Sequence, residues 1–281
     1  MIALRMIGAA WSPAVRRLQA PAASVALLTV CLVVLAGMLA PLSGYVPGYD
    51  VVPARAGSGP GLEAWLGTDH LGRDVFWRLV HACRAFTIPG VLAAATATCI
   101  GLPAGAAAGW RPGIVASALR FLTDVIAAVP RLVLVLLVCG VLGTGVVPLA
   151  IGAGLAYTPA LSETIRDRVE TLRVEGRVDA WRAHGLSDTR ILWLHLVALG
   201  CGRLIARRSL ELFAFVLVLE TTLSYIGGFG VQEPSPSWGN MLAFDWGHAV
   251  HPVPALAPAA AIWWTLWATT RLAATFAEGD G

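Results

Sequence analysis

Hydrophobic and charged residues of this chain fall in long blocks rather than in short amphipathic repeats. Three blocks contain no Asp, Glu, Lys or Arg at all: residues 18–49, 85–110 and 132–162. Each exceeds the roughly 20 residues with which an α-helix, rising about 1.5 Å per residue, crosses about 30 Å of hydrocarbon. The core of a soluble domain does not require runs of this length. The pattern therefore predicts an all-α, polytopic membrane protein.

About six transmembrane helices follow from where these blocks begin and end. Pro21 and Pro41 flank the first helix, and the Gly/Pro-rich stretch after it lacks apolar periodicity, as in an extramembrane loop. The third and fourth helices share residues 114–162, and the glycines at 140–145 with Pro148 would divide them into a long third and a short fourth helix. The expected spans are residues 22–42, 86–109, two within 114–162, 204–226 and 253–272.

Composition and the placement of arginine predict the orientation. Of the 281 residues, 57% are hydrophobic and 13% are charged, so most of the chain cannot be ordinary solvated surface. Most arginines fall in segments that would share one side of the membrane with the N-terminus, and the other side would hold chiefly Arg55, Arg73, Arg78 and Arg84. The positive-inside rule then places both termini in the cytoplasm.

The N-terminal region is expected to be a retained helix rather than a secretory signal. Basic residues precede an apolar stretch, as in a signal peptide, but the stretch continues to Ala40 without a small-residue cleavage site near a short apolar core. The expected organisation is a cytoplasmic segment at 1–21, a transmembrane domain at 22–275 with a cytoplasmic region at 163–195, and a cytoplasmic tail at 276–281.

Lysine is absent from the sequence, and all 20 basic residues are arginine. A phosphate-binding GxxxxGK[ST] loop needs a lysine at the β- and γ-phosphates, so this chain cannot carry that site. If transport is driven by ATP, another polypeptide must bind the nucleotide. The five cysteines show no CxxC spacing and are expected to be small core residues.

The polar segment at 163–195 is the most informative part of the chain. It holds six acidic residues and six arginines, several of them at the i,i+3 spacing of a solvated helix. A helix over 162–184 is expected to end at Gly185, after which Ser187 and Asp188 would cap a second, short helix. Two helical pieces joined by a sharp turn form an elbow that can enter a groove of a soluble partner.

A second charged segment, residues 65–78, precedes the second expected helix. Asp69 and Arg73, and likewise Asp74 and Arg78, stand at i,i+4 spacing, so both pairs could form on one helix face. The segment is either an interfacial helix pinned by ion pairs or a surface that contacts a soluble protein. Neither interpretation gives it a catalytic role.

Glu220 lies within the otherwise apolar stretch 212–226. A carboxylate inside a membrane is costly, so it is expected either to face the bundle interior or a water-filled path, or to form a structural hydrogen bond with a neighbouring helix. Asp245, His248 and His251 lie near the outer end of the sixth expected helix. Histidine suits nickel and zinc, but three such residues on an irregular loop are weak evidence, and no metal site is assigned.

Three separated motifs resemble those of a known family, the inner-membrane permeases of binding-protein-dependent ABC importers, specifically the peptide/nickel (dipeptide/oligopeptide) branch. Asp-Ala-Trp at 179–181 and Gly185 stand where the family has E-A-A-x3-G, with Asp and Trp departing from the pattern. The segment WLGTDHLGRDVFWR at 65–78 resembles WLGTDxLGRDxxSR. The segment GVQEPSPSWGNML at 230–242 resembles GVQPPxPSWGxML, with Glu233 in place of a proline.

The resemblance implies a set of partners and site residues. The elbow would be a coupling helix seated on a separate ATP-binding subunit, which holds ATP and Mg, while this chain carries no cofactor. A homologous second permease would complete a heterodimer in the lipid of the bacterial inner membrane, an extracytoplasmic solute-binding protein would deliver the solute, and no nucleic acid is involved. Contact with the ATPase is implied for Asp179, Ala180, Trp181, Gly185, Ser187, Asp188 and Arg190, and a periplasmic gating motif for Gly67, Thr68, Asp69, Gly72, Arg73 and Asp74.

The expected function is that of a non-enzymatic permease subunit of an ATP-driven importer of short peptides, with nickel or a metal chelate as the alternative solute. A secondary transporter driven by an ion gradient would instead show inverted repeats and paired midplane carboxylates. An intramembrane hydrolase would need a recognisable serine and histidine spacing, and the sequence has no GxSxG. A pure assembly factor would copurify with a transporter but be dispensable for flux.

Overall fold

A computed structural model of the chain describes residues 16–46, 50–110, 112–248 and 251–277. Within these ranges the ordered elements are all helices and no strand forms, which confirms the all-α class. The elements are α2 (Pro21–Leu39), the 3-10 helices η1 (Ala40–Ser43) and η2 (Pro53–Arg55), α3 (Val75–Trp110), α4 (Ile114–Ala127), α5 (Arg131–Leu142), α6 (Val146–Val174), α7 (Arg177–Ala183), α8 (Asp188–Arg190), the π-helical η3 (Ile191–Cys201), α9 (Gly202–Ile226), α10 (Trp238–His248) and α11 (Val253–Ala277).

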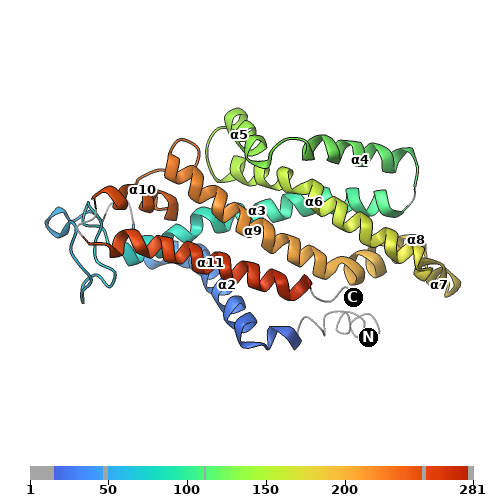
Figure 1. Cartoon of the computed structure of the whole chain (residues 1–281), viewed down its shortest axis with the longest axis horizontal. Coiled ribbons are helices and arrows are strands. Elements are labelled where there is room, and N and C mark those ends of the chain that lie inside the picture. Colours follow the sequence, from blue (N-terminus) through green and yellow to red (C-terminus); the bar gives the residue numbers. More distant parts are fainter. Residues whose placement is uncertain (1–15, 47–49, 111, 249–250, 278–281) are drawn as a thin grey trace.

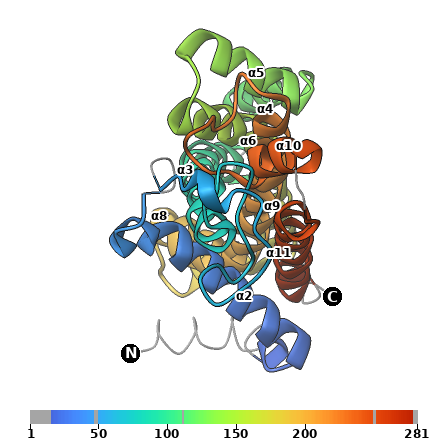
Figure 2. The same ribbon diagram turned by 90° about the vertical axis from the view of Figure 1, so that its left-hand side faces the viewer.

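The long helices lie side by side along the longest axis of the molecule, with α3 and α9 central, α4 and α5 on one side, and α2 and α11 on the other (Figures 1 and 2). The loop that precedes α3 lies at one end together with α10. The short helices α7 and α8 lie at the opposite end, and the first residues of α2 and the last residues of α11 point towards that same end (Figure 1).

Three helical segments are long and apolar enough to cross a membrane: Pro21–Ser43, Val75–Trp110 and Gly202–Ile226. The pair α4 and α5 adds a fourth if it is counted as one span. Helices α6 and α11, with 29 and 25 residues, have the length of a span but are not among these segments. The described residues therefore form a polytopic membrane protein, and the number of six spans stays a prediction.

The division of the third and fourth helices differs from the expected one. A break does occur at the glycines, because α5 ends at Leu142 and α6 begins at Val146. The third helix is not long, however: it splits into α4 and α5 with a bend of 87°. Pro130 disfavours helical backbone at the residue before it, which ends α4. Nor is the fourth helix short, since Pro148 lies in the first turn of α6, where proline is tolerated.

Glycines hold α3 against α6. Gly101, Gly105 and Gly109 repeat every four residues on α3, and a side chain at any of them would meet a backbone carbonyl of α6. The distances from an added Cβ are 3.0 Å to the oxygen of Thr158 at Gly101 and 2.7 Å to that of Arg166 at Gly109. Small residues at this spacing let two membrane helices approach closely, so the pair forms one packed unit.

Candidate functional site

The elbow, residues 175–190, lies at the end of the molecule where α6 stops (Figure 1). Gly176 has a φ of +74° and separates α6 from α7. The expected single helix over 162–184 is therefore interrupted, because a glycine in the left-handed conformation ends a helix. The charged residues up to Val174 extend α6, and only the seven residues of α7 form the first arm of the elbow.

The turn between α7 and α8 is a Schellman motif centred on Gly185. Its N–H donates to the carbonyl of Arg182 at 2.8 Å, and the N–H of Leu186 donates to that of Trp181 at 3.2 Å. Both bonds need the φ of +78° that Gly185 adopts. No atom lies within 4 Å of a Cβ added at Gly185, so the turn requires glycine for its backbone conformation rather than for space.

Arg182 fixes the angle between the two arms, and its role was not predicted from the sequence. Its Nε donates to Oδ1 of Asp188 at 2.9 Å across the turn, and its Nη1 lies 3.4 Å from Oδ1 of Asp179. The hydrogen bond to Asp188 raises the pKa of the Arg182 guanidinium. The same guanidinium lies 5.6 Å from the ring centre of Trp110, the last residue of α3. The elbow is thus attached to the end of α3 as well as to α6.

The predicted coupling residues divide into an outer and an inner set. Of the predicted residues, Trp181 and Asp188 are partly buried. Trp181 packs against the hydrophobic core, as does the neighbouring Leu186, which was not among the predicted residues. Ser187 occupies the position before α8, as expected, although its side chain makes no capping hydrogen bond. The predicted coupling residues exposed to solvent are Asp179, Ala180, Gly185, Ser187 and Arg190. The elbow thus has an exposed rim, formed by these solvent-exposed residues, on a partly buried base. This is the form that binding to a soluble partner would require.

At the opposite end, a buried ion-pair cluster joins the two motifs that flank the membrane helices. We call Asp69, Arg73, Arg78 and Glu233 the outer cluster. Arg73 lies 2.6 Å from Asp69 and 2.6 Å from Glu233, and Arg78 lies 2.7 Å from Glu233 and 3.4 Å from Asp69. The first three side chains are at most 2% exposed and Glu233 is 26% exposed. Burial alone would lower the pKa of Arg73, but its bonds to Glu233 and Asp69 outweigh burial and raise it.

The expected ion pairs on one helix face are only partly correct. Asp69 and Arg73 do pair, but within a turn, where Oδ1 of Asp69 also accepts the N–H groups of Leu71 and Arg73 at 2.9 Å. Asp74 instead caps α3, since its Oδ1 accepts the N–H of Trp77 at 3.1 Å. Arg78 consequently pairs with Glu233 rather than with Asp74. The side chain of a capping residue faces the helix terminus, which makes it unsuited to an i,i+4 pair.

The remaining residues of this predicted gating motif build the turn itself. Thr68 donates to the carbonyl of Arg55 and accepts the N–H of Ser58, so it fixes the preceding loop. Gly67 and Gly72 have φ values of +78° and +79°, and a Cβ at Gly72 would collide with the carbonyl oxygen of Val52. The structure therefore gives Gly67, Thr68 and Gly72 a conformational function: they hold this turn and the loop before it.

The third motif, residues 230–242, is bonded to α3 and includes the start of α10. Ser237 and Asn240 cap α10 reciprocally: the Ser237 hydroxyl accepts the N–H of Asn240 at 3.3 Å, and Oδ1 of Asn240 accepts the N–H of Ser237 at 3.0 Å. Trp238 donates from Nε1 to the carbonyl of Leu79 on α3 at 3.0 Å. The loop carrying Glu233 is thus held in place from both sides.

Glu220 is fully buried in α9 and accepts a hydrogen bond from Ser224 one turn later. It does not line any of the four best-formed cavities among the described residues. Of the two expectations for this carboxylate, the position favours a structural hydrogen bond, although the bond with Ser224 lies within α9 and does not reach a neighbouring helix.

Replacing Glu220 with glutamine is expected to leave solute uptake within about twofold of the unmodified protein, because the amide oxygen still accepts the Ser224 hydroxyl. Uptake by the assembled transporter in membrane vesicles measures this. Normal assembly with abolished transport would contradict the structural interpretation and restore the expectation that Glu220 faces the path.

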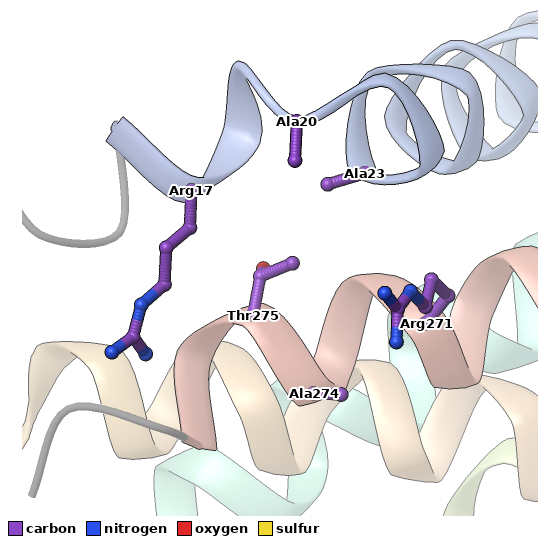
Figure 3. Close-up of a pocket in the computed structure, with 6 residues that line it drawn as sticks. All are labelled: Arg17, Ala20, Ala23, Arg271, Ala274 and Thr275. Carbon is purple, nitrogen blue, oxygen red and sulfur yellow. The ribbon is translucent and has the colours of Figure 1, made fainter.

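The cavities are small and separate. One of about 150 Å³ lies between the start of α2 and the end of α11, lined by Arg17, Arg271, Thr275 and three alanines (Figure 3). Another of about 280 Å³ lies beside the third motif, with His81 and Arg84 in its wall. The described residues contain no group of three or more His, Cys, Asp or Glu that could hold a metal ion. The side chains of Asp245 and His248 lie outside the described set.

Comparison with known proteins agrees with this arrangement. Residues 101–277 match the protein family described as the binding-protein-dependent transport system inner membrane component. The dipeptide transport system permease protein DppC of Alkalihalophilus pseudofirmus is 27% identical over 234 residues, 83% of this chain and 76% of that protein. A putative peptide transport system permease protein of Brucella suis is 30% identical over 220 residues, 78% of this chain and 73% of that protein.

A third relative widens the range of named solutes. The glutathione transport system permease protein GsiD of Pectobacterium atrosepticum is 28% identical over 188 residues, 67% of this chain and 62% of that protein. The resemblance seen in the three sequence motifs is confirmed by these matches. The chain therefore belongs to the family of inner-membrane permease components of binding-protein-dependent ABC importers, and it is a multi-pass transport subunit rather than an enzyme.

Proposed function

We propose that this chain forms one half of the translocation path of an ATP-driven importer of short peptides. The names of its relatives, which refer to dipeptides, peptides and glutathione, support the choice of peptides over nickel. A related permease completes the path, and an extracytoplasmic binding protein delivers the solute to the end that carries the outer cluster. Both termini lie on the cytoplasmic side.

The observation that carries the proposal is the form of the elbow. Seven residues of α7 and three of α8 protrude beyond the helices that are long enough to span a membrane, and one arginine bridges the two arms. ATP and Mg are bound by a separate subunit, whose groove receives the exposed rim of α7. Because Arg182 contacts Trp110 and the base of the elbow packs against α6, movement of the elbow displaces α3 and α6 together.

Site-directed crosslinking tests the proposal. In a background where exposed Cys31 and Cys99 are replaced with serine, Ala180→Cys is expected to crosslink to the copurifying ATP-binding subunit in intact cells. Leu62→Cys is the matched control, since Leu62 is fully exposed in the loop at the other end of the molecule. Crosslinks from Leu62→Cys to the ATP-binding subunit, with none from Ala180→Cys, would reverse the proposed orientation.

A further inference from the structure

A group of charged side chains lies between α5, α6 and α9, away from the elbow and from the outer cluster. We call Arg131, Tyr157, Arg207, Arg208 and Glu211 the inner cluster. Glu211 accepts hydrogen bonds from Nε of Arg207 and Nη1 of Arg208, both at 2.8 Å, and from the Tyr157 hydroxyl at 3.2 Å. The guanidinium of Arg131 lies over the Tyr157 ring, 4.9 Å from its centre. These contacts fix three side chains around a single carboxylate and place Arg131 against the ring of one of them.

The inner cluster lies at a depth that the membrane covers. Glu211 is nine residues from the start of α9, which corresponds to about 14 Å along that helix. Tyr157 is eleven residues into α6, and Arg131 is the first residue of α5, directly after the 87° bend. Arginines near a helix end can extend to the membrane surface, but a glutamate and a tyrosine this far into their helices cannot.

The charged side chains of the inner cluster are not shielded by the chain itself. Arg207, Arg208 and Glu211 are 38%, 31% and 26% exposed, and Arg131 is exposed. Charged groups at membrane depth do not face lipid tails; they face the interior of a helix bundle or a water-filled cavity. The side of the molecule formed by α5, α6 and α9 at this level therefore does not contact lipid.

The charge of the inner cluster is unbalanced. The inner cluster contains three guanidinium groups and one carboxylate, and that carboxylate is bonded to Arg207 and Arg208. Arg131 contacts an aromatic face and has no acidic partner among the residues that the structure describes. A guanidinium in this position offers its donors in the planar arrangement that pairs with a carboxylate. The arrangement suits a negatively charged group that arrives from outside the chain.

We propose that the inner cluster lines the translocation path and binds the terminal carboxylate of the transported peptide through Arg131. Glu211 holds Arg207 and Arg208 in place, and Tyr157 positions Arg131. This inference rests on the proposed peptide-import function. It adds a contact inside the membrane domain at which the permease distinguishes a free carboxylate from a neutral end group.

Uptake of two peptides of identical sequence, one with a free C-terminal carboxylate and one amidated, tests the site in the reconstituted complete transporter. In the Arg131→Gln variant, uptake of the free acid is expected to fall about tenfold while uptake of the amide changes little, because one charge-assisted hydrogen-bonding partner is lost. Arg131→Lys should restore part of the preference, since it keeps the charge but not the planar geometry.

The control is Arg271→Gln, which removes an exposed arginine from α11, a helix that packs against α2, α9 and α10 rather than against α5 or α6. It should reduce uptake of the two peptides equally or not at all. An equal loss of both peptides in Arg131→Gln, or a failure of that variant to assemble with the second permease, would overturn the site and make the inner cluster a subunit contact. If the unmodified complex imports neither peptide, the peptide-import proposal itself is wrong and this site is lost with it.

Access to water gives a second, independent readout. In the cysteine-substituted background, Arg131→Cys is expected to react with a charged, membrane-impermeant thiol reagent during transport, whereas Leu137→Cys, exposed on the same helix, is not. Reaction at Leu137→Cys with none at Arg131→Cys would contradict an aqueous path along this face.

Discussion

Replacing Arg73 with methionine is expected to lower the free energy of unfolding of the permease by about 3–5 kcal/mol, because it leaves the buried carboxylate of Asp69 and the partly buried one of Glu233 without their shared partner. Arg73 is 2% exposed and lies 2.6 Å from both Asp69 and Glu233. Arg78 is the other guanidinium of the outer cluster, and one guanidinium cannot neutralise two carboxylates, of which Asp69 is buried. Unfolding of the purified complex in detergent, followed by its thermal midpoint, measures the loss.

The matched control is Arg55→Met, which removes an arginine from an exposed pair in the same loop region. Arg55 lies 3.0 Å from Glu63, but the two side chains are 53% and 75% exposed. Such pairs contribute about 0–1 kcal/mol, so the midpoint should hardly move. Equal effects of the two substitutions would show that the outer cluster is not a buried network.

Glu233 completes that network and could not have been recognised from the sequence. It is 160 residues from Arg73, and in the motif it stands where the family pattern has proline. Local spacing carries no information on contacts of that separation, so sequence analysis treats the residue as a departure. The structure shows instead that it supplies the second carboxylate for two buried arginines. The rule that buried charges are paired predicts that such a residue exists, but it does not predict where in the sequence it lies.

Helix positions were more accessible to prediction than their bends. The expected spans agree with α2, α9 and α11 to within about five residues. Gly185 was correctly placed at the turn of the elbow, because a glycine after a charged helix is a common stop signal. Pro130 and Gly176, which break the third helix and the charged helix, are equally visible in the sequence. Their effect depends on tertiary contacts, since both residue types also occur within continuous helices.

The contact of Arg182 with Asp188 illustrates the same limit. The two residues are six apart, a separation that no regular helix brings together, so the pair forms only because the chain reverses at Gly185. Six arginines occur in this segment with similar neighbours, and sequence spacing favours none of them. Residues whose partners lie across a turn are therefore identified only after the turn is known.

A single helix connects the two ends of the molecule that the proposed function requires. Asp74 caps α3 beside the outer cluster, and Trp110 ends α3 beneath Arg182 of the elbow. The 36 residues of α3 correspond to about 54 Å. Close packing against α6 along the glycines makes the pair rigid enough for displacement of the elbow to reach the outer cluster. In the proposed function, transmission from the elbow therefore depends on the α3–α6 contact.

Replacing Gly105 with valine is therefore expected to lower the free energy of unfolding by about 3 kcal/mol and to abolish transport, since overpacking at a helix contact forces the backbones apart. A Cβ at this position collides with the carbonyl oxygen of Ser162 and lies 3.0 Å from the Cβ of Ile165. Backbone atoms of a packed helix cannot move aside as a flexible side chain can. Thermal unfolding and peptide uptake of the assembled complex measure the two effects.

Gly140→Val provides the control within α5. It adds the same side chain to a glycine of an apolar helix, but nothing lies within 4 Å of a Cβ at Gly140. Valine also has a better helix propensity than glycine, so this variant should unfold at or above the original midpoint. If Gly105→Val retains both stability and transport, α3 and α6 do not move as a unit, and the elbow must act on the outer end through another helix.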